Sequence, residues 1–375
     1  MKKEFKRREA CFFCSSPYQV MGAVGIVNGL KLDADLYIAG EFPGYRTLAE
    51  KLKKYNCFAN VYVADSKIVS GTGKLASIKM TFFAEKAVST YMPKDISYDQ
   101  YFVTSRSTLK SSQLGVLRKR NPNITRVVYE DGLGTYSNNG SLFRVSGLRR
   151  KIEKILHWDL DDPKKIRLMA YLPELVKMPD FLQGHKVEQM PRLQIDPTTR
   201  DLFFDIFSVG REQSIFEKYI IFDTKRRGAE LDVLTKEEKD LLDSCYTLVT
   251  RYAGEDVICK PHPKSTEQPG CQMKSYAHQG VPMEVLYMDM PDLENRVLIS
   301  HVSSAVFTPK IFLDCEPVVI CLHKILKDSR ISRNFTEIYE KFRGTYRQPE
   351  RVIAPSSMEE LEDVLSHIVS GDTKR

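Results

Sequence analysis

The sequence predicts an α/β protein built from two parallel-sheet domains. The chain has 375 residues, roughly two or three times the size of a typical domain, so two packed cores are expected. Its contents of 42% hydrophobic and 28% charged residues are ordinary for a soluble globular protein. Short runs rich in β-branched and aromatic residues alternate with longer helix-forming stretches, and this alternation occurs twice along the chain.

The first half of the chain alternates strand-like runs with helical stretches. The expected strands are Cys11–Cys14, Leu36–Ala39, Val61–Ala64, Tyr101–Thr104 and Thr125–Tyr129. The expected helices are Tyr18–Leu30, Tyr45–Lys54, Ala76–Thr90 and Thr108–Lys119. Strand–helix–strand order predicts a parallel sheet with helices on both faces. We assign residues 1–200 to this N-terminal domain, and place the passage to the next domain in the proline-rich segment 147–211.

The alternation restarts after that segment. The expected strands are Tyr219–Asp223, Asp256–Lys260, Glu284–Met288, Val297–Ser300 and Pro317–Cys321. The expected helices are Lys236–Ala253 and Ser303–Leu313. We assign residues 212–350 to a C-terminal domain of the same type. Residues 351–375 are expected to form a final helix, with Ser356 or Ser357 as its N-cap.

The charge of the chain is mildly basic and spread along its length. The 56 basic and 49 acidic residues give a net charge of +7, and no stretch interleaves basic with aromatic residues, so nucleic acid is not an expected partner. Only Lys2–Arg8 and Arg149–Lys154 are locally dense. They are interpreted as solvated helix faces, with contacts to anionic lipid head groups or to an anionic substrate as the alternatives. No segment reaches about 18 uninterrupted apolar residues, so we expect a soluble or peripheral protein.

The N-terminus resembles the start of a signal peptide, but its apolar run, Ala10–Cys14, breaks at Ser15–Gln19. That run is too short for a signal core and is interpreted as the first strand. Eight cysteines without a dense framework indicate free thiols in a reducing cytoplasm. Cys11 and Cys14 form a C-x-x-C pair inside the strand, and we interpret them as packing residues rather than as a redox or metal site.

A pair of carboxylates follows the strand-like run Thr125–Tyr129. Glu130 and Asp131 stand at its end and are followed by Gly132. In parallel α/β sheets ligands gather at the carboxyl ends of strands, which makes the two carboxylates candidates for chemistry. The alternative is structural: the carboxylates bind loop amides and the glycine only turns the chain.

A histidine between two prolines follows the strand that ends at Lys260. The prolines of Pro261-His262-Pro263 restrict the backbone and fix the position of the imidazole. A protonated His262 between Lys260 and Lys264 could donate a proton or a hydrogen bond to a leaving phosphate. The alternative is a structural histidine in a basic loop.

Two serines follow a later strand. Ser303 and Ser304 lie where the apolar run Val297–Ser300 gives way to an expected helix. Serine hydroxyls and free amides at a helix N-terminus form a natural anion site. The same residues could be no more than an N-cap.

These motifs carry a resemblance to a known group of enzymes. The order Glu130-Asp131-Gly132, His262-Pro263, Ser303-Ser304 resembles the acidic-acidic-Gly, His-Pro and Ser-Ser motifs of bacterial sialyltransferases. The stretch Cys14–Gln19 resembles the start of glycosyltransferase family 52, which includes lipooligosaccharide sialyltransferases. The resemblance implies a GT-B fold, with two Rossmann-like domains facing across a cleft. It also implies inverting, metal-independent transfer of sialic acid from CMP-sialic acid to a hydroxyl of a surface glycan, such as lipooligosaccharide or capsule.

The resemblance also implies roles for single residues on the donor side. His262 would assist departure of the CMP phosphate, and Ser303 and Ser304 would contact that phosphate. Lys260 and Pro263 would belong to the same donor site, and Gly132 to the turn beside the carboxylates.

The resemblance leaves the identity of the catalytic base open. The base would be Glu130 or Asp131, or instead Asp232 in the loop after the first strand of the second domain, with Asp223 behind it. The basic stretch Lys225-Arg226-Arg227 in that loop departs from the neutral loop expected for the family.

Two further readings of the function stay open. The chain could use another donor, for hexosyl or glycerophosphate transfer into surface polysaccharide. It could also be a non-catalytic nucleotide- or glycan-binding protein of an assembly complex. For the transferase we expect a cytoplasmic protein, with peripheral attachment at the inner face of the plasma membrane and homodimer formation as further expectations.

Overall fold

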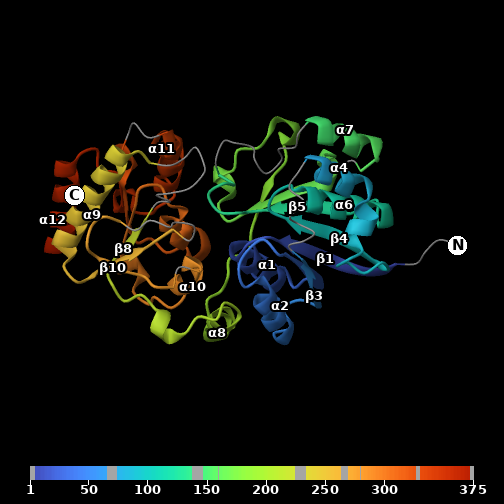
Figure 1. The fold of residues 1–375 in the computed structure, drawn as a ribbon, viewed down its shortest axis with the longest axis horizontal. Coiled ribbons are helices and arrows are strands. Elements are labelled where there is room, and N and C mark those ends of the chain that lie inside the picture. The colour runs from blue at the N-terminus through green and yellow to red at the C-terminus, as the bar shows by residue number, and fades with distance from the viewer. Residues whose placement is uncertain are drawn as a thin grey trace. The chain divides into compact units, whose positions relative to one another are not determined.

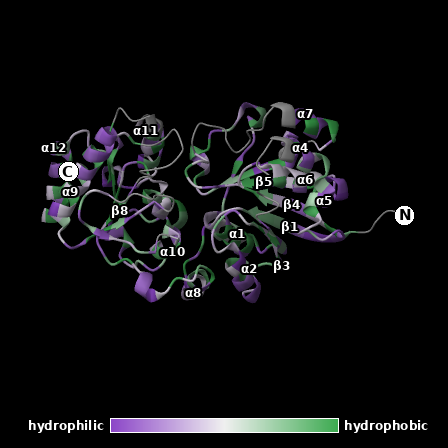
Figure 2. Cartoon of the chain, viewed as in Figure 1, coloured by the Kyte–Doolittle hydropathy of each residue, from purple (hydrophilic) through white to green (hydrophobic). Residues whose placement is uncertain are grey.

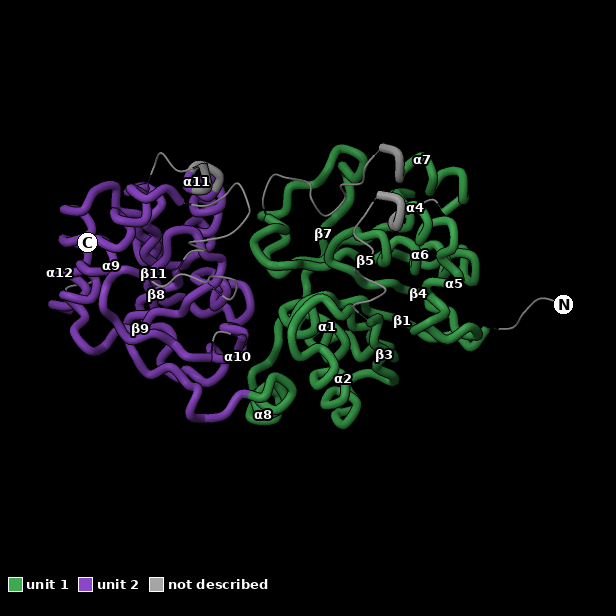
Figure 3. The backbone as a smooth tube through the Cα atoms, viewed as in Figure 1, with its two compact units in different colours: residues 1–208 green, residues 209–375 purple. Residues whose placement is uncertain are grey.

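The computed structural model describes residues 5–65, 74–136, 147–158, 160–223, 234–262, 269–278, 280–326 and 330–371 (Figure 1). The chain divides into two compact units, residues 1–208 and residues 209–375, which Figure 3 colours separately. Each unit is described by itself.

The first unit is a parallel sheet of seven strands. Their order across the sheet is β3-β2-β1-β4-β5-β6-β7, and every pairing is parallel. The strands are β1 (Lys6–Cys14), β2 (Ala34–Ala39), β3 (Asn60–Ala64), β4 (Ile96–Val103), β5 (Thr125–Tyr129), β6 (Ile166–Ala170) and β7 (Val187–Gln189). The helices are α1 (Pro17–Leu30), α2 (Tyr45–Lys54), α4 (Lys74–Phe82), α5 (Ala84–Val88), α6 (Thr108–Arg120), α7 (Gly147–Ile155) and α8 (Pro197–Ile206).

Helices cover both faces of this sheet. Figure 1 shows α1 and α2 on one face and α4, α6 and α7 on the other. The central strands are coloured as hydrophobic in Figure 2, as expected for a sheet that is buried on both sides. Both α1 and α6 begin at a serine N-cap: Ser16 accepts a hydrogen bond from the Gln19 amide, and Ser107 accepts one from the Lys110 amide. These caps fix where the chain turns from strand to helix.

A glycine of α6 lies directly against the single tryptophan of the chain. Trp158 is buried, and a Cβ atom built on Gly115 would lie 2.3 Å from its ring. The indole is packed within the core on the α6 side of the sheet, so it has little room to move. The close approach of α6 to Trp158 therefore requires glycine at this position.

We expect Gly115→Ala to destabilise the chain. Overpacking against the indole lowers the free energy of unfolding by about 3 kcal/mol. Alanine has a higher helix propensity than glycine, which offsets about 1 kcal/mol, so we expect a net loss of about 2 kcal/mol. Thermal unfolding measures this loss as a lower melting temperature. Gly134→Ala is the matched control, since its Cβ would meet nothing within 4 Å. An unchanged melting temperature for Gly115→Ala would show that the indole is free to shift.

The second unit is a parallel sheet of six strands, in the order β10-β9-β8-β11-β12-β13. The strands are β8 (Tyr219–Phe222), β9 (Val257–Lys260), β10 (Lys274–Ser275), β11 (Val297–Ser300), β12 (Val318–Cys321) and β13 (Val352–Ile353). The α-helices are α9 (Lys236–Ala253), α10 (Met283–Tyr287), α11 (Arg330–Arg343) and α12 (Met358–Ser370). The last helix, α12, begins at the N-cap Ser357 and packs on α9.

Both sheets have the same strand order. Counted from the first strand of each unit, it is 3-2-1-4-5-6, the order of the Rossmann fold, with a seventh strand added in the first unit. The prediction of an α/β chain with two Rossmann-like parallel sheets, the make-up of the GT-B fold, is confirmed. The cleft expected between the two domains stays a prediction. In the described part of the chain, no helix is long and apolar enough to cross a membrane.

Some element predictions were wrong. Glu284–Met288 was expected to be a strand, but this segment belongs to helix α10, which starts after Pro282. The four apolar residues that follow Glu284 are too few to show a period, and a proline before the segment favours a helix start. The predicted helix Ser303–Leu313 is two short pieces, a 3-10 turn at Ser304–Val306 and a π-helical turn at Pro309–Leu313. The expected helix Ala76–Thr90 is interrupted at Phe83, between α4 and α5.

Several elements were not predicted. They are the strands β6, β7, β10 and β13 and the helices α7, α8 and α11. Two of these strands lie in the proline-rich segment that had been interpreted as the passage between domains. That segment instead completes the first sheet.

Candidate functional site

The predicted donor-side residues lie at the carboxyl edge of the second sheet. Ser300 pairs with Phe222 and Phe222 pairs with Lys260, so strands β11, β8 and β9 end level with one another. The strand order reverses between β8 and β11, and this switch point is where Rossmann-like sheets bind ligands. The loops that begin at Asp223 and His301 therefore flank the switch point, and His262 lies on the adjacent strand end.

Lys260 is the last residue of β9 and is almost completely buried. Its ammonium lies 5.1 Å from the centre of the Tyr276 ring, and it is attracted by the carboxylate of Glu284 on α10. Burial lowers the pKa of Lys260 to about 8, with Glu284 acting in the opposite direction. At neutral pH the side chain is thus mostly charged, and an anion beside it would stabilise that charge.

His262 lies two residues beyond β9 and is half-buried. Pro261 before it is buried, which anchors the loop to the sheet edge. Pro263 and Lys264, the residues that follow in the motif, lie outside the described residues. His262 is therefore placed at the expected edge and keeps part of its surface open to solvent.

The serine motif follows β11 as a hydrogen-bonded turn. The Ser300 hydroxyl donates to the Phe222 carbonyl over 2.9 Å and accepts from the Ser303 amide over 2.9 Å. The Ser303 hydroxyl accepts a weak hydrogen bond from the Ala305 amide, and Ser304 is exposed. Only a three-residue 3-10 turn starts here, so the helix dipole that was expected to favour an anion is missing. What remains for an anion is the exposed Ser304 hydroxyl.

The structure describes one of the two aspartates that are candidates for the base in this unit. Asp223 follows β8 and is 2% exposed. Its amide donates to the Lys260 carbonyl, and its carboxylate accepts from the Tyr246 hydroxyl over 3.2 Å. Asp223 thus ties β8 to α9 and β9, and its role as a base stays a prediction. Asp232 lies outside the described residues.

In the first unit, Glu130 is the centre of a buried polar cluster. One carboxylate oxygen accepts from the Tyr18 hydroxyl over 2.8 Å. The other accepts from the Tyr171 amide over 2.9 Å and from the Tyr136 hydroxyl. Burial raises the pKa of Glu130 to about 7, although these three hydrogen bonds lower it. With 1% of its surface exposed, Glu130 links α1, β5 and β6 through these hydrogen bonds. Its role as a base stays a prediction.

Asp131 is the more accessible member of the pair. It is half-buried, and both carboxylate oxygens accept from the side-chain amide of Gln19, over 3.1 and 3.0 Å. Gln19 is itself held by the Ser15 amide, which donates to its side-chain oxygen over 2.7 Å. The buried ammonium of Lys110 and the Asp131 carboxylate attract each other; burial lowers the pKa of Lys110, and Asp131 counteracts that shift. The carboxylate is thus oriented by an amide and faces a positive charge.

The turn after the carboxylates requires glycine. Gly132 has a φ of +71°, a conformation that residues with a Cβ rarely adopt. It allows the Thr135 amide to reach the Gly132 carbonyl and the Thr135 hydroxyl to accept from the Asp131 amide over 2.9 Å. The turn therefore folds back on Asp131 and fixes its backbone.

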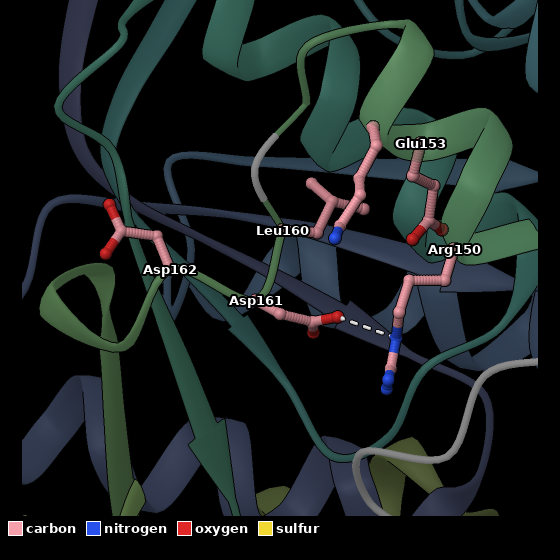
Figure 4. Close-up of a pocket in the computed structure, with 6 residues that line it drawn as sticks. Arg150, Glu153, Leu160, Asp161 and Asp162 are labelled. Atoms are coloured by element: carbon pink, nitrogen blue, oxygen red, sulfur yellow. Dashed lines mark ion pairs between the residues drawn. The ribbon is translucent and has the colours of Figure 1, made fainter. Parts of the chain in front are cut away.

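A separate cavity of about 310 Å³ lies within the first unit (Figure 4). It is lined by Arg150, Glu153, Lys154, Leu160, Asp161 and Asp162. Figure 4 marks the ion pair between Arg150 and Asp161, whose atoms are 3.6 Å apart, and Asp161 also pairs with the buried Arg106 over 2.6 Å. None of the predicted site residues lines this cavity. Of its carboxylates, Glu153 and Asp161 are paired with arginines and Asp162 with Lys165.

Sequence reasoning missed the partners of the predicted residues. Tyr136 and Tyr171 surround Glu130, Lys110 faces Asp131, and Glu284 faces Lys260. Each partner is 6 to 41 positions from the residue that it contacts. The extremes are Tyr136 and Tyr171, which are 6 and 41 positions from Glu130. The sequence feature that came closest to predicting a partner was the stretch Cys14–Gln19, on which the family resemblance partly rests. It contains Gln19, whose side-chain amide binds the Asp131 carboxylate.

Comparison with solved structures finds glycosyltransferases at low identity. CalG4, the calicheamicin glycosyltransferase, is 13% identical, with 98% of this chain and 97% of that chain covered and a TM-score of 0.44. UGT2 of Phytolacca americana, in its apo form, is 10% identical over 97% and 91% of the two chains, with a TM-score of 0.47. TcCGT1 in complex with UDP is 12% identical over 98% and 91%, with a TM-score of 0.45.

No protein-family description and no curated protein matches the chain. The family 52 assignment stays a prediction.

Proposed function

We propose that the chain is an inverting glycosyltransferase that moves sialic acid from CMP-sialic acid to a hydroxyl of a surface glycan. The observation that carries the proposal is the gathering of Lys260, His262 and the Ser303-Ser304 turn at one carboxyl edge, next to the switch point of a Rossmann-like sheet. These residue types at that edge suit a nucleotide phosphate. The motif order that resembles bacterial sialyltransferases supports sialic acid as the sugar.

On the donor side, three groups have distinct tasks. The Lys260 ammonium supplies positive charge beneath the phosphate, and the exposed Ser304 hydroxyl donates a hydrogen bond to it. His262 donates a proton or a hydrogen bond to the phosphate oxygen that leaves the anomeric carbon. Together they stabilise the negative charge that grows on CMP as it departs.

On the acceptor side, Asp131 is the base that the geometry favours. Glu130 is buried with three donors directed at its carboxylate, whereas Asp131 is half-buried and held in one orientation by Gln19. A general base must come within hydrogen-bond reach of the hydroxyl that it deprotonates, and only an accessible carboxylate can do so. Glu130 then acts as a positioning residue for the loop that carries Asp131.

The reaction balances as a single displacement. The acceptor hydroxyl attacks the anomeric carbon as its proton passes to the Asp131 carboxylate. The bond from that carbon to the phosphate oxygen breaks, and its electron pair stays on CMP. Inversion follows because the nucleophile enters opposite the leaving group. We place the enzyme in the cytoplasm, at the inner face of the membrane, which agrees with eight free cysteines.

Nucleotide binding tests the donor class. We expect CMP to raise the melting temperature, and UDP and GDP to leave it unchanged. At about 100 times the dissociation constant the gain is about 2.7 kcal/mol, which corresponds to roughly 5–10 °C for units of this size. Lys260→Met should reduce the CMP effect, measured against the melting temperature of the same variant without nucleotide, because the substitution also removes the charge that faces Glu284.

The other outcomes select the alternatives. Stabilisation by UDP or GDP in place of CMP would indicate transfer of another sugar. Stabilisation by CMP, with neither transfer from CMP-sialic acid nor its hydrolysis, would indicate a non-catalytic nucleotide-binding protein.

A further inference from the structure

Two adjacent phenylalanines are exposed where α4 ends. Phe82 is the last residue of α4 and Phe83 separates it from α5, and their exposed fractions are 52% and 59%. Their neighbours Thr81 and Ala84 are buried, so the backbone of this junction is fixed to the core while both rings face solvent. Two adjacent apolar rings held in water indicate a surface that is covered by something else.

The neighbouring helix α7 also exposes an apolar side chain. It contacts α4, and Figure 1 draws the two helices on the same face of the first sheet. Its last residue, Ile155, is 67% exposed. The side chains of Arg150, Lys151 and Lys154 are exposed on the same helix. We call the exposed residues of α4, α5 and α7 the α4–α7 surface.

The charge of the α4–α7 surface is strongly biased. In the described side chains 78–90 and 150–157, the exposed cations are Lys79, Lys86, Arg150, Lys151 and Lys154. The exposed carboxylate in these ranges is Glu85, which lies 3.8 Å from Arg120. The other carboxylate, Glu153, is buried and pairs with Arg106. Arg150 is paired with Asp161, which lies outside these ranges. The surface therefore offers apolar rings beside an excess of positive charge, carried by the four exposed lysines.

We propose that the α4–α7 surface docks the chain onto an anionic lipid bilayer. Exposed phenylalanine and isoleucine side chains enter the boundary between head groups and acyl chains, while lysines and arginines bind lipid phosphates. The positive charge disfavours a second copy of the same surface as the partner, since like charges would face each other. The proposal rests on this surface alone and stands whichever donor the chain uses.

Vesicle flotation tests the proposal with the full chain. We expect the chain to bind vesicles of phosphatidylglycerol and phosphatidylcholine in equal parts, and to bind pure phosphatidylcholine far less. Phe82→Ser combined with Phe83→Ser should lower the partition coefficient at least about tenfold, because two apolar side chains no longer enter the bilayer. Phe216→Ser is the matched control: this ring is 75% exposed, lies in the second unit, and should leave binding unchanged.

A second pair of variants tests the charge. Lys151→Gln with Lys154→Gln should weaken binding to the anionic vesicles about tenfold or more and leave the weak binding to phosphatidylcholine unchanged. The matched control is Lys53→Gln with Lys54→Gln, two exposed lysines in the last turn of α2, which should bind as the unaltered chain does. Thermal unfolding checks that all variants remain folded.

Three results would overturn the proposal. The first is equal binding of the unaltered chain to both kinds of vesicle. The second is unchanged partition of the phenylalanine variant. The third is a change in oligomeric state of that variant with no change in vesicle binding, which would make the surface a contact between copies of the chain.

Discussion

Replacing His262 by alanine is expected to lower turnover with CMP-sialic acid about 100-fold or more, the scale usual for a general acid–base group. His262 lies just beyond β9, where the carboxyl edge of the second sheet also presents Lys260. Without the imidazole, the departing phosphate loses its proton or hydrogen-bond donor, while the lysine charge still holds the nucleotide. The loss should therefore appear in kcat, with little change in the KM for the donor.

The matched control is His278→Ala. His278 belongs to the same unit, is exposed, and contacts the side chain of Gln213 through its ring nitrogen. It should retain full turnover. An equal loss in both variants would point to a general effect on the unit, and unchanged turnover in His262→Ala would falsify the role proposed for this histidine.

Asp131→Asn is expected to lower turnover about 100-fold or more, whereas Glu130→Gln should mainly change how stability depends on pH. The asparagine side chain would keep the shape of the aspartate and lose the ability to take a proton. Glutamine at position 130 can still accept from the Tyr171 and Tyr136 donors, and its amide can donate to the Tyr18 hydroxyl. The two substitutions thus separate chemistry from structure at neighbouring positions.

The pH dependence follows from the raised pKa of Glu130. Burial places that pKa at about 7 in the folded chain, so between about pH 5 and 7 the folded chain binds a proton that the unfolded chain releases. The free energy of unfolding contributed by this group is therefore largest below that window and falls as pH rises through it. The full change is about 3 kcal/mol, from the difference between the ordinary and raised values. Glu130→Gln should remove that slope in chemical denaturation curves.

The reverse pattern would contradict this division of roles. A large loss of turnover in Glu130→Gln with an active Asp131→Asn would make the buried carboxylate the base. Equal, mild losses in both would mean that neither carboxylate takes the proton, and would direct attention to Asp232.

Strands were predicted correctly where they are apolar and a helix follows them directly. Thr125–Tyr129 was predicted with the bounds that β5 has, because its β-branched and aromatic residues lie between a turn and two carboxylates. The strand Ile166–Ala170 was missed, since it stands among prolines and carries an arginine and a methionine. The helix predicted over Ser303–Leu313 was wrong in form, because Pro309 lacks an amide hydrogen and interrupts regular helix hydrogen bonding.

The sequence predicted the positions of the candidate residues but not their surroundings. Glu130 and Asp131 are adjacent, and successive residues at a strand end point in opposite directions, so one enters the core and the other faces the loop. Which one is buried depends on Tyr18, Tyr136 and Tyr171, which come from three other parts of the chain. Local sequence carries no record of such contacts.

The division of the chain at residue 208 separates the two halves of the proposed chemistry. Lys260, His262 and Ser304 all belong to the second unit, while Asp131 and the Gln19 that orients it belong to the first. Under the proposed function, substitutions in the second unit would change the nucleotide preference and substitutions in the first unit the acceptor preference. Recombination near residue 208 would then exchange the proposed donor residues as one set, without rebuilding either sheet.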